Sequence, residues 1–281
     1  MRTALFGPLK RNISVIGQGA WNIERSPRKQ VVEALRAGLD AGATHIDTAE
    51  MYGDGQSEEI VGEAIAGRRD EVFLVSKVLP SNASAANVVK ACERSLKHLE
   101  VEQLDCYLLH WRGRVPLEET FGAFETLKQA GKIAAFGVSN FDVDDLEEAH
   151  AIVGAGALAC NQVLYYLQER AIEHRVLPWC KKHKVALTAY SPFGSGDFPG
   201  ANSAGGRVLS EIGKAHGATA RQVALAFLTR DPVVFAIPKA ANPAHTMDNA
   251  AAGDLTLSDA DVERIDAAFP RGPAPRGLPM I

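Results

Sequence analysis

The sequence predicts an α/β fold in which parallel strands alternate with helices. Three short apolar runs, at residues 44–47, 72–76 and 104–109, are separated by longer segments whose apolar residues recur at helical spacing. Short apolar runs between amphipathic segments are typical of parallel strands joined by helices. In open α/β sheets and in barrels, the chemistry is found at the carboxyl ends of the strands. The residues that end these runs are therefore the first candidates for a functional site.

Four groups able to take part in proton transfer follow these runs. Asp47 ends the first run, and Tyr52 follows five residues later. Lys77 closes the second run, and His110 closes the third. A free tyrosine has a pKa of about 10, so it exchanges a proton near neutral pH only if its surroundings change that value. A buried ammonium at Lys77 favours the phenolate, and Asp47 keeps that ammonium charged. We therefore expect a proton-transfer site around Tyr52, in which His110 orients a carbonyl oxygen.

Seven segments resemble the aldo-keto reductases, in particular the prokaryotic members. They are HIDTAEMYGDGQSEEIVGEAI, VFLVSKV, LDCYLLHW, FGVSNF, NQV, AYSPFG and IPKA, in the order in which that family carries them, between about Gly17 and Asn249. The four groups described above resemble the catalytic tetrad of the family. The resemblance implies a (β/α)8 TIM barrel that transfers hydride from a nicotinamide cofactor to an aldehyde or ketone. In the roles it implies, Tyr52 is the proton donor.

Length and composition fit one ordinary globular enzyme. A chain of 281 residues suits a barrel, which typically needs about 250, so we expect one domain over residues 1–281. The net charge of -4 gives no reason to expect nucleic acid or an acidic membrane as a partner. No apolar run reaches the roughly 18 residues that span a bilayer. We expect a cytoplasmic monomer that acts on a small-molecule carbonyl compound.

The cysteines give no sign of disulfides or of a metal site. Cys92, Cys106, Cys160 and Cys180 are scattered through predicted helices and strands without a CxxC pair. We expect them to be small buried hydrophobes in a reducing compartment. Cys180 with His183 makes half of a zinc spacing, but no second half follows.

The chain begins with a predicted hairpin and a first barrel strand. Residues 3–14 hold a Gly7-Pro8 turn between short apolar stretches, which predicts a hairpin that plugs the bottom of a barrel. Residues 14–18 are the expected first strand. The sequence GQGAWN at its end starts a dinucleotide-binding fingerprint, but Asn22 stands at the third glycine and no helix opens directly after it. Glycines at a strand end also let the backbone approach a ligand.

Helices and strands then alternate to the end of the chain. Helices are predicted at 28–42, at 58–66 with Ser57 as the cap, at 88–99 and at 117–127 closed by Gly131. Later strands are predicted at 134–139, 158–163, 185–190 and 233–237, with helices at 219–229, from Asn242-Pro243 onward and at 258–268. Residues 191–206 are expected to form a long functional loop. The tail FPRGPAPRGLPMI is too rich in Pro and Gly for regular structure, and we expect it to fold over the barrel mouth.

The resemblance also implies a cofactor site. Ser139, Asn140 and Gln162 match residues that bind the nicotinamide amide, and Tyr190 matches the aromatic that stacks on the nicotinamide ring. Ser191, Phe193 and Gly194 open the loop that would cradle the pyrophosphate through backbone donors. Gly19, Ala20, Trp21 and Asp47 complete the expected contacts around the nicotinamide.

The expected site for the 2′-phosphate of NADP departs from the family pattern. Lys239 matches the lysine that meets this phosphate, but Ala240 stands in place of a serine, His245 in place of an arginine and Asp248 in place of a glutamate, while Asn249 is kept. Arginine holds a phosphate bidentately and is always charged, whereas histidine is mostly neutral at pH 7. We therefore expect NADP(H) as cofactor, with a weaker preference over NAD(H) than is usual.

Two other functions remain open beside carbonyl reduction. Trp21, Tyr52, His110 and Trp111 would wall a substrate pocket, which fits an NADPH-dependent reductase of aldehydes and ketones. A second hypothesis is a nicotinamide-sensing regulatory subunit, like the channel-associated members of the family, although no extension precedes the barrel. A third is a metal or phosphate-sugar enzyme on a barrel, but clustered carboxylates or histidines are missing from the strand ends.

Overall fold

The computed structural model describes residues 1–281 and contains a parallel barrel of eight strands. The strands are β3 (Gln18–Gly19), β4 (His45–Asp47), β5 (Phe73–Val78), β6 (Leu104–Leu109), β7 (Ile133–Ser139), β8 (Leu158–Leu164), β9 (Ala186–Tyr190) and β10 (Val234–Ala236). Each strand is hydrogen-bonded to the next one along the chain. Parallel bridges from Ile16 to Ala236 and from Gly19 to Lys239 join the first strand to the last. The predicted (β/α)8 barrel is therefore confirmed.

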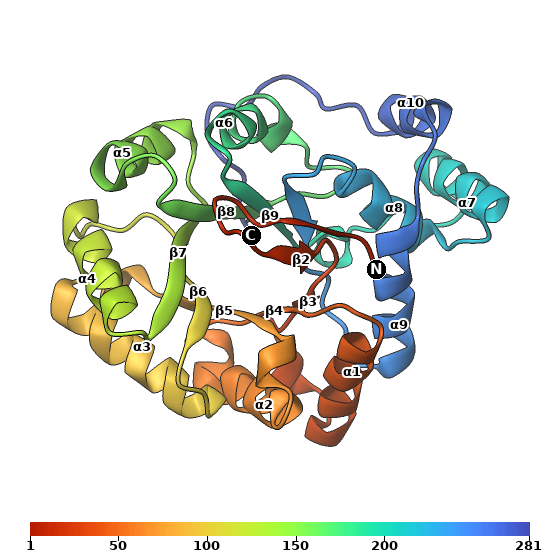
Figure 1. The fold of residues 1–281 in the computed structure, drawn as a ribbon. Coiled ribbons are helices and arrows are strands. Elements are labelled where there is room, and N and C mark those ends of the chain that lie inside the picture. The colour runs from red at the N-terminus through yellow and green to blue at the C-terminus, as the bar shows by residue number, and fades with distance from the viewer.

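Helices surround the strands on the outside of the barrel (Figure 1). They are α1 (Arg28–Asp40), α2 (Gln56–Ile65), α3 (Ala85–Leu99), α4 (Leu117–Gln129), α5 (Val143–Val153), α6 (Val176–His183), α7 (Ala204–His216), α8 (Ala220–Leu228), α9 (Pro243–Ala251) and α10 (Asp259–Ala268). Helix α7 packs on α8, and α10 packs on α7. Helices α7 and α10 therefore form an additional layer at one side of the barrel. The expected extra C-terminal helix is α10, and Ser258 caps it in a capping box.

Glycine at position 19 allows the barrel to close. The backbone N–H of Gly19 donates a 3.1 Å hydrogen bond to the carbonyl of Pro238. A Cβ atom on Gly19 would lie 2.6 Å from the carbonyl oxygen of Ile237, closer than packed atoms allow. Gly19 of the GQG sequence therefore allows β3 to pack closely against the segment after β10. The sequence is not part of a dinucleotide-binding fingerprint. The predicted first strand over 14–18 was placed too early, because Ser14 belongs to the preceding hairpin.

The predicted N-terminal hairpin is present and plugs the bottom of the barrel. It consists of β1 (Thr3–Leu5) and β2 (Asn12–Ser14), which pair antiparallel. Phe6 in its turn is fully buried. The ring of Phe6 lies 4.8 Å from that of Phe73, 4.9 Å from that of Phe235 and 5.7 Å from that of His45. Since His45 and Phe73 begin their strands, the hairpin covers the amino ends and leaves the carboxyl ends open.

Some local predictions were wrong. Ser57 does not cap α2, which begins at Gln56 after Gly55; its hydroxyl instead donates a 2.7 Å hydrogen bond to the carbonyl of Ala20. Residues 191–206 are not a continuous loop, because α7 already begins at Ala204 with Ser203 as its cap. No helix range was predicted for the segments that form α5, α6 and α7.

The remaining predictions on packing are confirmed. All four cysteines are buried free thiols. The tail after Phe269 contains no regular secondary structure, and its last two residues reach the cavity described below. None of the helices combines the length and the apolar character that crossing a membrane requires.

Candidate active site

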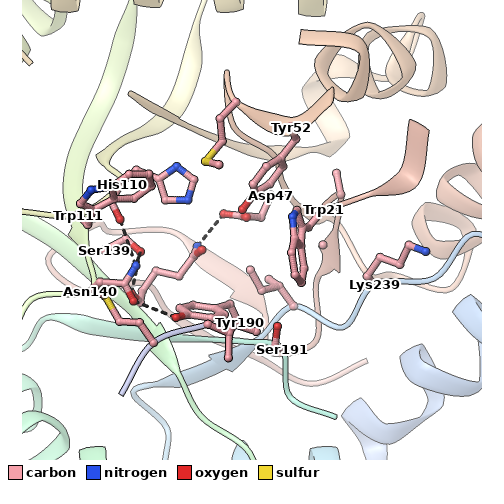
Figure 2. A pocket seen from close by; sticks show the side chains of 17 residues that line it. Trp21, Asp47, Tyr52, His110, Trp111, Ser139, Asn140, Tyr190, Ser191 and Lys239 are labelled. Atoms are coloured by element: carbon pink, nitrogen blue, oxygen red, sulfur yellow. Dashed lines mark hydrogen bonds between the residues drawn. The ribbon is translucent and has the colours of Figure 1, made fainter. Parts of the chain in front are cut away.

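A cavity of about 340 Å³ opens at the carboxyl ends of the strands (Figure 2). Its lining includes Asp47, Tyr52 and His110, three of the four predicted proton-transfer groups. The other lining residues are Gly19, Ala20, Trp21, Met51, Trp111, Ser139, Asn140, Gln162, Tyr190, Ser191, Ile237, Lys239, Met280 and Ile281. Lys77, the fourth group, contacts the hydroxyl of Tyr52 and is fully buried. The four groups that the sequence placed at strand ends therefore meet in one place.

Lys77 is the central residue of this group. Its Nζ atom lies 2.5 Å from Oδ1 of Asp47 and 3.3 Å from the hydroxyl oxygen of Tyr52, and it donates a third hydrogen bond of 2.7 Å to the carbonyl of Thr48. An ammonium has three N–H groups, so these contacts account for all of them. The orientation of Lys77 is thereby fixed between the carboxylate and the phenol.

The ammonium and carboxylate stabilise each other's charge inside the barrel. Burial by itself lowers the pKa of Lys77, but Asp47 and Tyr52 more than offset that effect, and the net pKa is raised. Burial raises the pKa of Asp47, while Lys77 and Gln162 lower it in part. Gln162 donates 2.7 Å from Nε2 to Oδ2 of Asp47 (Figure 2). Because both carboxylate oxygens accept from N–H donors, we take Asp47 to be ionised and Lys77 to be protonated.

The expected acidification of Tyr52 is corrected by the structure. Burial raises the pKa of Tyr52 above its usual value, and the lowering by the Lys77 charge and hydrogen bond is smaller. Lys77 thus lowers the pKa of Tyr52, as predicted, but burial raises that pKa by more. The phenol consequently remains protonated at neutral pH, which is the form that a proton donor requires.

His110 is held as a neutral imidazole. Burial, with a smaller effect of the Lys77 charge, lowers the pKa of His110 to about 2. Its ring packs against Tyr52 with 5.8 Å between the centroids, and against Trp111 with 4.9 Å. Nδ1 of His110 is buried without a hydrogen-bond partner. A neutral imidazole has one donor and one acceptor nitrogen, so His110 can offer a single hydrogen bond to a neighbouring oxygen.

Amide and hydroxyl groups from β7, β8 and β9 form the side of the cavity opposite Tyr52 (Figure 2). Asn140 donates 3.2 Å from Nδ2 to the carbonyl of His110, and its Oδ1 accepts a 3.0 Å hydrogen bond from Tyr190. Ser139 donates 2.9 Å to the carbonyl of Gln162. Asn140 and Ser191 both adopt left-handed backbone conformations, with φ of 59° and 46°. Such conformations in residues other than glycine are uncommon and gather at functional sites.

This donor and acceptor set fits a nicotinamide amide. A carboxamide offers one carbonyl acceptor and two N–H donors, and the cavity wall presents a serine hydroxyl and two side-chain amides. The aromatic ring of Tyr190 beside them supplies an apolar face for a planar ring. Burial raises the pKa of Tyr190 to about 12, so this phenol stays neutral.

Comparison with known proteins identifies the family. The model of the Aldo/keto reductase family matches residues 15–269. The chain belongs to the aldo-keto reductase family. It is thus an oxidoreductase that reduces carbonyl groups with NADP(H), as the resemblance of its sequence implied.

Individual relatives agree over nearly the full chain. This aldo-keto reductase is 45% identical over 272 residues to the methylglyoxal reductase YeaE of Escherichia coli, covering 96% of each chain. It is 33% identical to the glyoxal reductase of Bacillus subtilis, covering 89% of this chain and 87% of that protein. A crystal structure of an aldo/keto reductase from Klebsiella pneumoniae in complex with NADP and acetate has 42% identity and a TM-score of 0.93, with each chain covered completely.

Six of the cofactor residues expected from the sequence do not line the main cavity of the reductase. Phe193 and Gly194 lie in the loop after β9, and Ala240 and Asn249 line a small separate hollow beside α9. His245 is exposed on α9. Asp248 accepts a 2.9 Å hydrogen bond from Nε2 of Gln222. The cavity is thus lined by the residues expected around the nicotinamide, together with Ser191 and Lys239, whereas these six residues lie outside its lining.

Sequence reasoning missed several residues that line the cavity. Met51 lies between two predicted site residues, Asp47 and Tyr52, which was a signal that could have been used. Ile237 directly precedes the Pro238-Lys239 pair. Met280 and Ile281 were expected only as part of a tail that covers the mouth, because no pattern in the tail distinguishes its end from the rest.

Proposed function

We propose that this enzyme reduces small aldehydes and ketones with Tyr52 as the proton donor. The observation that carries the proposal is the position of Lys77 Nζ, which lies 2.5 Å from Asp47 and 3.3 Å from the Tyr52 hydroxyl. An ammonium held at this distance stabilises the phenolate that remains after the proton has left. Asp47 keeps the ammonium charged and oriented.

His110 positions the substrate in this proposal. As a neutral imidazole with no partner at Nδ1, it is set to carry its proton on Nε2 and to donate to the carbonyl oxygen. NADPH, when bound, supplies the hydride that adds to the carbonyl carbon. Tyr52 then delivers the proton to the oxygen, so the carbonyl becomes an alcohol and the charge left on the phenol faces Lys77.

Ser139, Asn140, Gln162 and Tyr190 hold the nicotinamide in this proposal. Ser139, Asn140 and Tyr190 lie on the side of the cavity opposite Tyr52, and Gln162 also lines the cavity. Together they offer the hydrogen-bonding groups that a carboxamide needs. We assign Lys239, with the residues around His245, to the phosphate end of the cofactor. Because position 245 lacks an arginine, the residues of the family motif alone would give NADPH a smaller margin over NADH than a full set of cations gives.

The substrate class that fits best is a short 2-oxoaldehyde such as methylglyoxal. The cavity of about 340 Å³ must hold the nicotinamide ring as well as the substrate, which leaves room for only a few heavy atoms. Trp21, Met51 and Trp111 give it apolar walls suited to a methyl group. The relative with 45% identity is a methylglyoxal reductase.

We further propose a cytoplasmic enzyme that works as a monomer. All groups of the proposed site come from one chain, so no second copy is needed to complete it. The four thiols are free, which suits a reducing compartment.

Replacement of Tyr52 by phenylalanine tests the assignment. In Tyr52→Phe, we expect the rate of methylglyoxal reduction, followed by NADPH absorbance, to fall by about 10²–10⁴-fold, because the donated proton is lost. Titration calorimetry with NADPH should give a Kd close to that of the wild type. Retained turnover in this variant would refute the role of Tyr52.

A further inference from the structure

The proposed 2′-phosphate site carries fewer cations than its ligand requires. Of the residues expected there, Lys239 alone is a lysine or an arginine, since Ala240 has no polar side chain and a histidine stands at position 245. Lys239 is exposed at the edge of the cavity and contributes a point charge without a fixed donor geometry. A dianionic phosphate monoester is bound best by more than one charged donor. The site therefore needs a second cation from the surrounding residues.

Arg221 on α8 meets this requirement. Its side chain is exposed, and its guanidinium carbon lies 4.5 Å from the ring centroid of Phe198 and 4.9 Å from that of Phe193. The two rings contact each other edge to face, with 5.5 Å between the centroids. A guanidinium packed on two aromatic rings keeps its position without using its N–H groups. Arg221 is therefore an ordered cation whose hydrogen-bond donors are available.

The rings that contact Arg221 belong to the loop between β9 and α7, which we call the cofactor loop. Phe193 is one of the residues assigned to the pyrophosphate, and Phe198 lies five residues further along the same loop. Ser191, where this loop begins, lines the cavity of the nicotinamide. Arg221 thus contacts the loop that begins at the wall of this cavity.

Gln222, the residue after Arg221, connects the start of α8 to α9. Nε2 of Gln222 donates hydrogen bonds of 2.9 Å to Oδ1 of Asp248 and of 3.0 Å to its carbonyl oxygen. Oγ1 of Thr219 donates 3.3 Å to the other carboxylate oxygen of Asp248. Asp248 is one helical turn after His245 on α9. The start of α8 is therefore fixed between the cofactor loop and the helix segment where the expected arginine is missing.

The acid in this group does not neutralise Arg221. Both carboxylate oxygens of Asp248 accept from Gln222 and Thr219, and Arg221 forms no ion pair with any carboxylate in the structure. An exposed arginine without an acidic partner is free to bind an anion. We propose that Arg221 binds the 2′-phosphate of NADPH and supplies the guanidinium that position 245 lacks. This inference rests on the proposed cofactor site and assigns its selectivity to a residue outside the family motif.

The test measures cofactor binding in the full chain. Arg221→Gln removes the charge, Arg221→Lys keeps the charge but loses the planar stack, and Lys214→Gln on the neighbouring α7 is the control. Lys214 is exposed and makes no ion pair, so its replacement changes the net charge equally without touching the loop or α9. Titration calorimetry gives the Kd of NADPH and of NADH for each protein.

The expected result is a loss of affinity for NADPH, the cofactor with the 2′-phosphate, and not for NADH. In Arg221→Gln, the Kd of NADPH should rise about tenfold, whereas that of NADH should change less than about twofold. Arg221→Lys should lie between the wild type and Arg221→Gln, and Lys214→Gln should match the wild type. An equal rise in the Kd of both cofactors would show that Arg221 only holds the loop in place. Unchanged Kd values would show that Arg221 has no role in binding. Either result overturns the proposal.

A fragment of the cofactor separates this proposal from that of the site itself. Adenosine 2′-phosphate should bind to the wild-type protein and lose affinity about tenfold in Arg221→Gln, with adenosine 5′-phosphate as the comparison. Equal affinity of the fragment for both proteins overturns the role of Arg221 while the Tyr52 proposal stands. Failure of the wild type to bind NADPH at all would overturn both proposals.

Discussion

Gln162 donates a 2.7 Å hydrogen bond from Nε2 to Oδ2 of Asp47, and so connects β8 to β4 through the inside of the barrel. The carboxylate of Asp47 is fully enclosed, with Lys77 on its other oxygen. A residue assigned to the nicotinamide thus also stabilises the charge that keeps Lys77 protonated. In the proposed site, cofactor binding and proton transfer would therefore share one hydrogen-bond chain.

Replacement of Gln162 by leucine should alter the pH dependence of the reaction. Loss of the donor raises the pKa of Asp47 further, because burial already raises it and Gln162 lowers it. A hydrogen bond to a charged group contributes about 1.5–3 kcal/mol, so the acid limb of kcat should move upward by about one to two pH units. The measurement is a pH profile of kcat at saturating NADPH.

Thr188→Val is the matched control for this experiment. Thr188 is aligned with Gln162 in the β8–β9 register, and its buried hydroxyl has no hydrogen-bond partner. The control should therefore leave the pH profile unchanged. An acid limb that stays in place in Gln162→Leu would show that Asp47 does not depend on this donor.

Removal of the ammonium in Lys77→Met should impair both stability and catalysis. The variant leaves a buried carboxylate unpaired, which costs about 3–5 kcal/mol in the free energy of unfolding. It also removes the charge that stabilises the Tyr52 phenolate, so kcat should fall by about 10²–10⁴-fold. Urea denaturation and NADPH oxidation measure the two effects.

A double variant separates the two effects of Lys77. In Asp47→Leu/Lys77→Met, no unpaired charge remains, so most of the lost stability should return. Activity should stay low, because the ammonium that contacts the Tyr52 hydroxyl is still absent. Recovery of turnover together with stability would contradict the role assigned to the ammonium.

The strand ends and the four proton-transfer groups were predictable because local sequence patterns identify them. Asp47, Lys77 and His110 each follow an apolar run, and parallel strands bring such positions to one end of a barrel. The first strand was misplaced because β3 has only two residues, too few for any periodicity to define its bounds. Helix α7 was missed because Gly205 and Gly206 stand near its start and resemble loop residues.

Other features of the site depend on three-dimensional contacts that the sequence does not encode locally. The net pKa of Tyr52 is the difference between burial and the attraction of Lys77, and only the structure gives the size of each. Arg221 has the sequence environment of an ordinary exposed helix residue, and its role depends on Phe193 and Phe198 from another segment. The contact of Ile281 with the cavity depends on the path of an irregular tail.

His45 should make the fold sensitive to acid. Burial lowers the pKa of His45 to about 3, and neither ring nitrogen has a hydrogen-bond partner. A histidine whose pKa is lowered on folding stabilises the native state above its unfolded pKa of about 6.5, and this contribution is lost as the pH falls toward the folded value. Between pH 7.5 and pH 5, the loss amounts to about 2 kcal/mol.

His45→Phe should remove this part of the acid sensitivity. The replacement keeps an aromatic ring against Phe6 and Phe73 and has no group to protonate. The free energy of unfolding, measured in urea at pH 7.5 and pH 5, should therefore fall by about 2 kcal/mol less in the variant than in the wild type. Equal losses in the two proteins would show that His45 is not the group that titrates.

Deletion of the last two residues should change substrate selection without affecting the fold. Met280 and Ile281 line the cavity but are 56% and 64% exposed, so they contribute little to the core. Their removal widens the mouth, so KM should rise for methylglyoxal and fall for bulkier aromatic aldehydes. Steady-state kinetics with both substrates and a melting curve measure this. A proportional change for both substrates would indicate that the tail does not select by size.

His245→Arg should strengthen NADPH binding if α9 faces the 2′-phosphate as proposed. His245 is exposed, so a longer side chain meets no steric barrier, and a guanidinium adds a permanent charge with paired donors. A charge-assisted hydrogen bond contributes about 1.5–3 kcal/mol, so the Kd of NADPH should fall on the order of tenfold while that of NADH stays constant. Calorimetry on this variant and on Arg221→Gln/His245→Arg completes the comparison. If both positions bind the same phosphate, the new arginine should compensate for the loss of Arg221. A variant with unchanged NADPH affinity would instead place the phosphate away from α9.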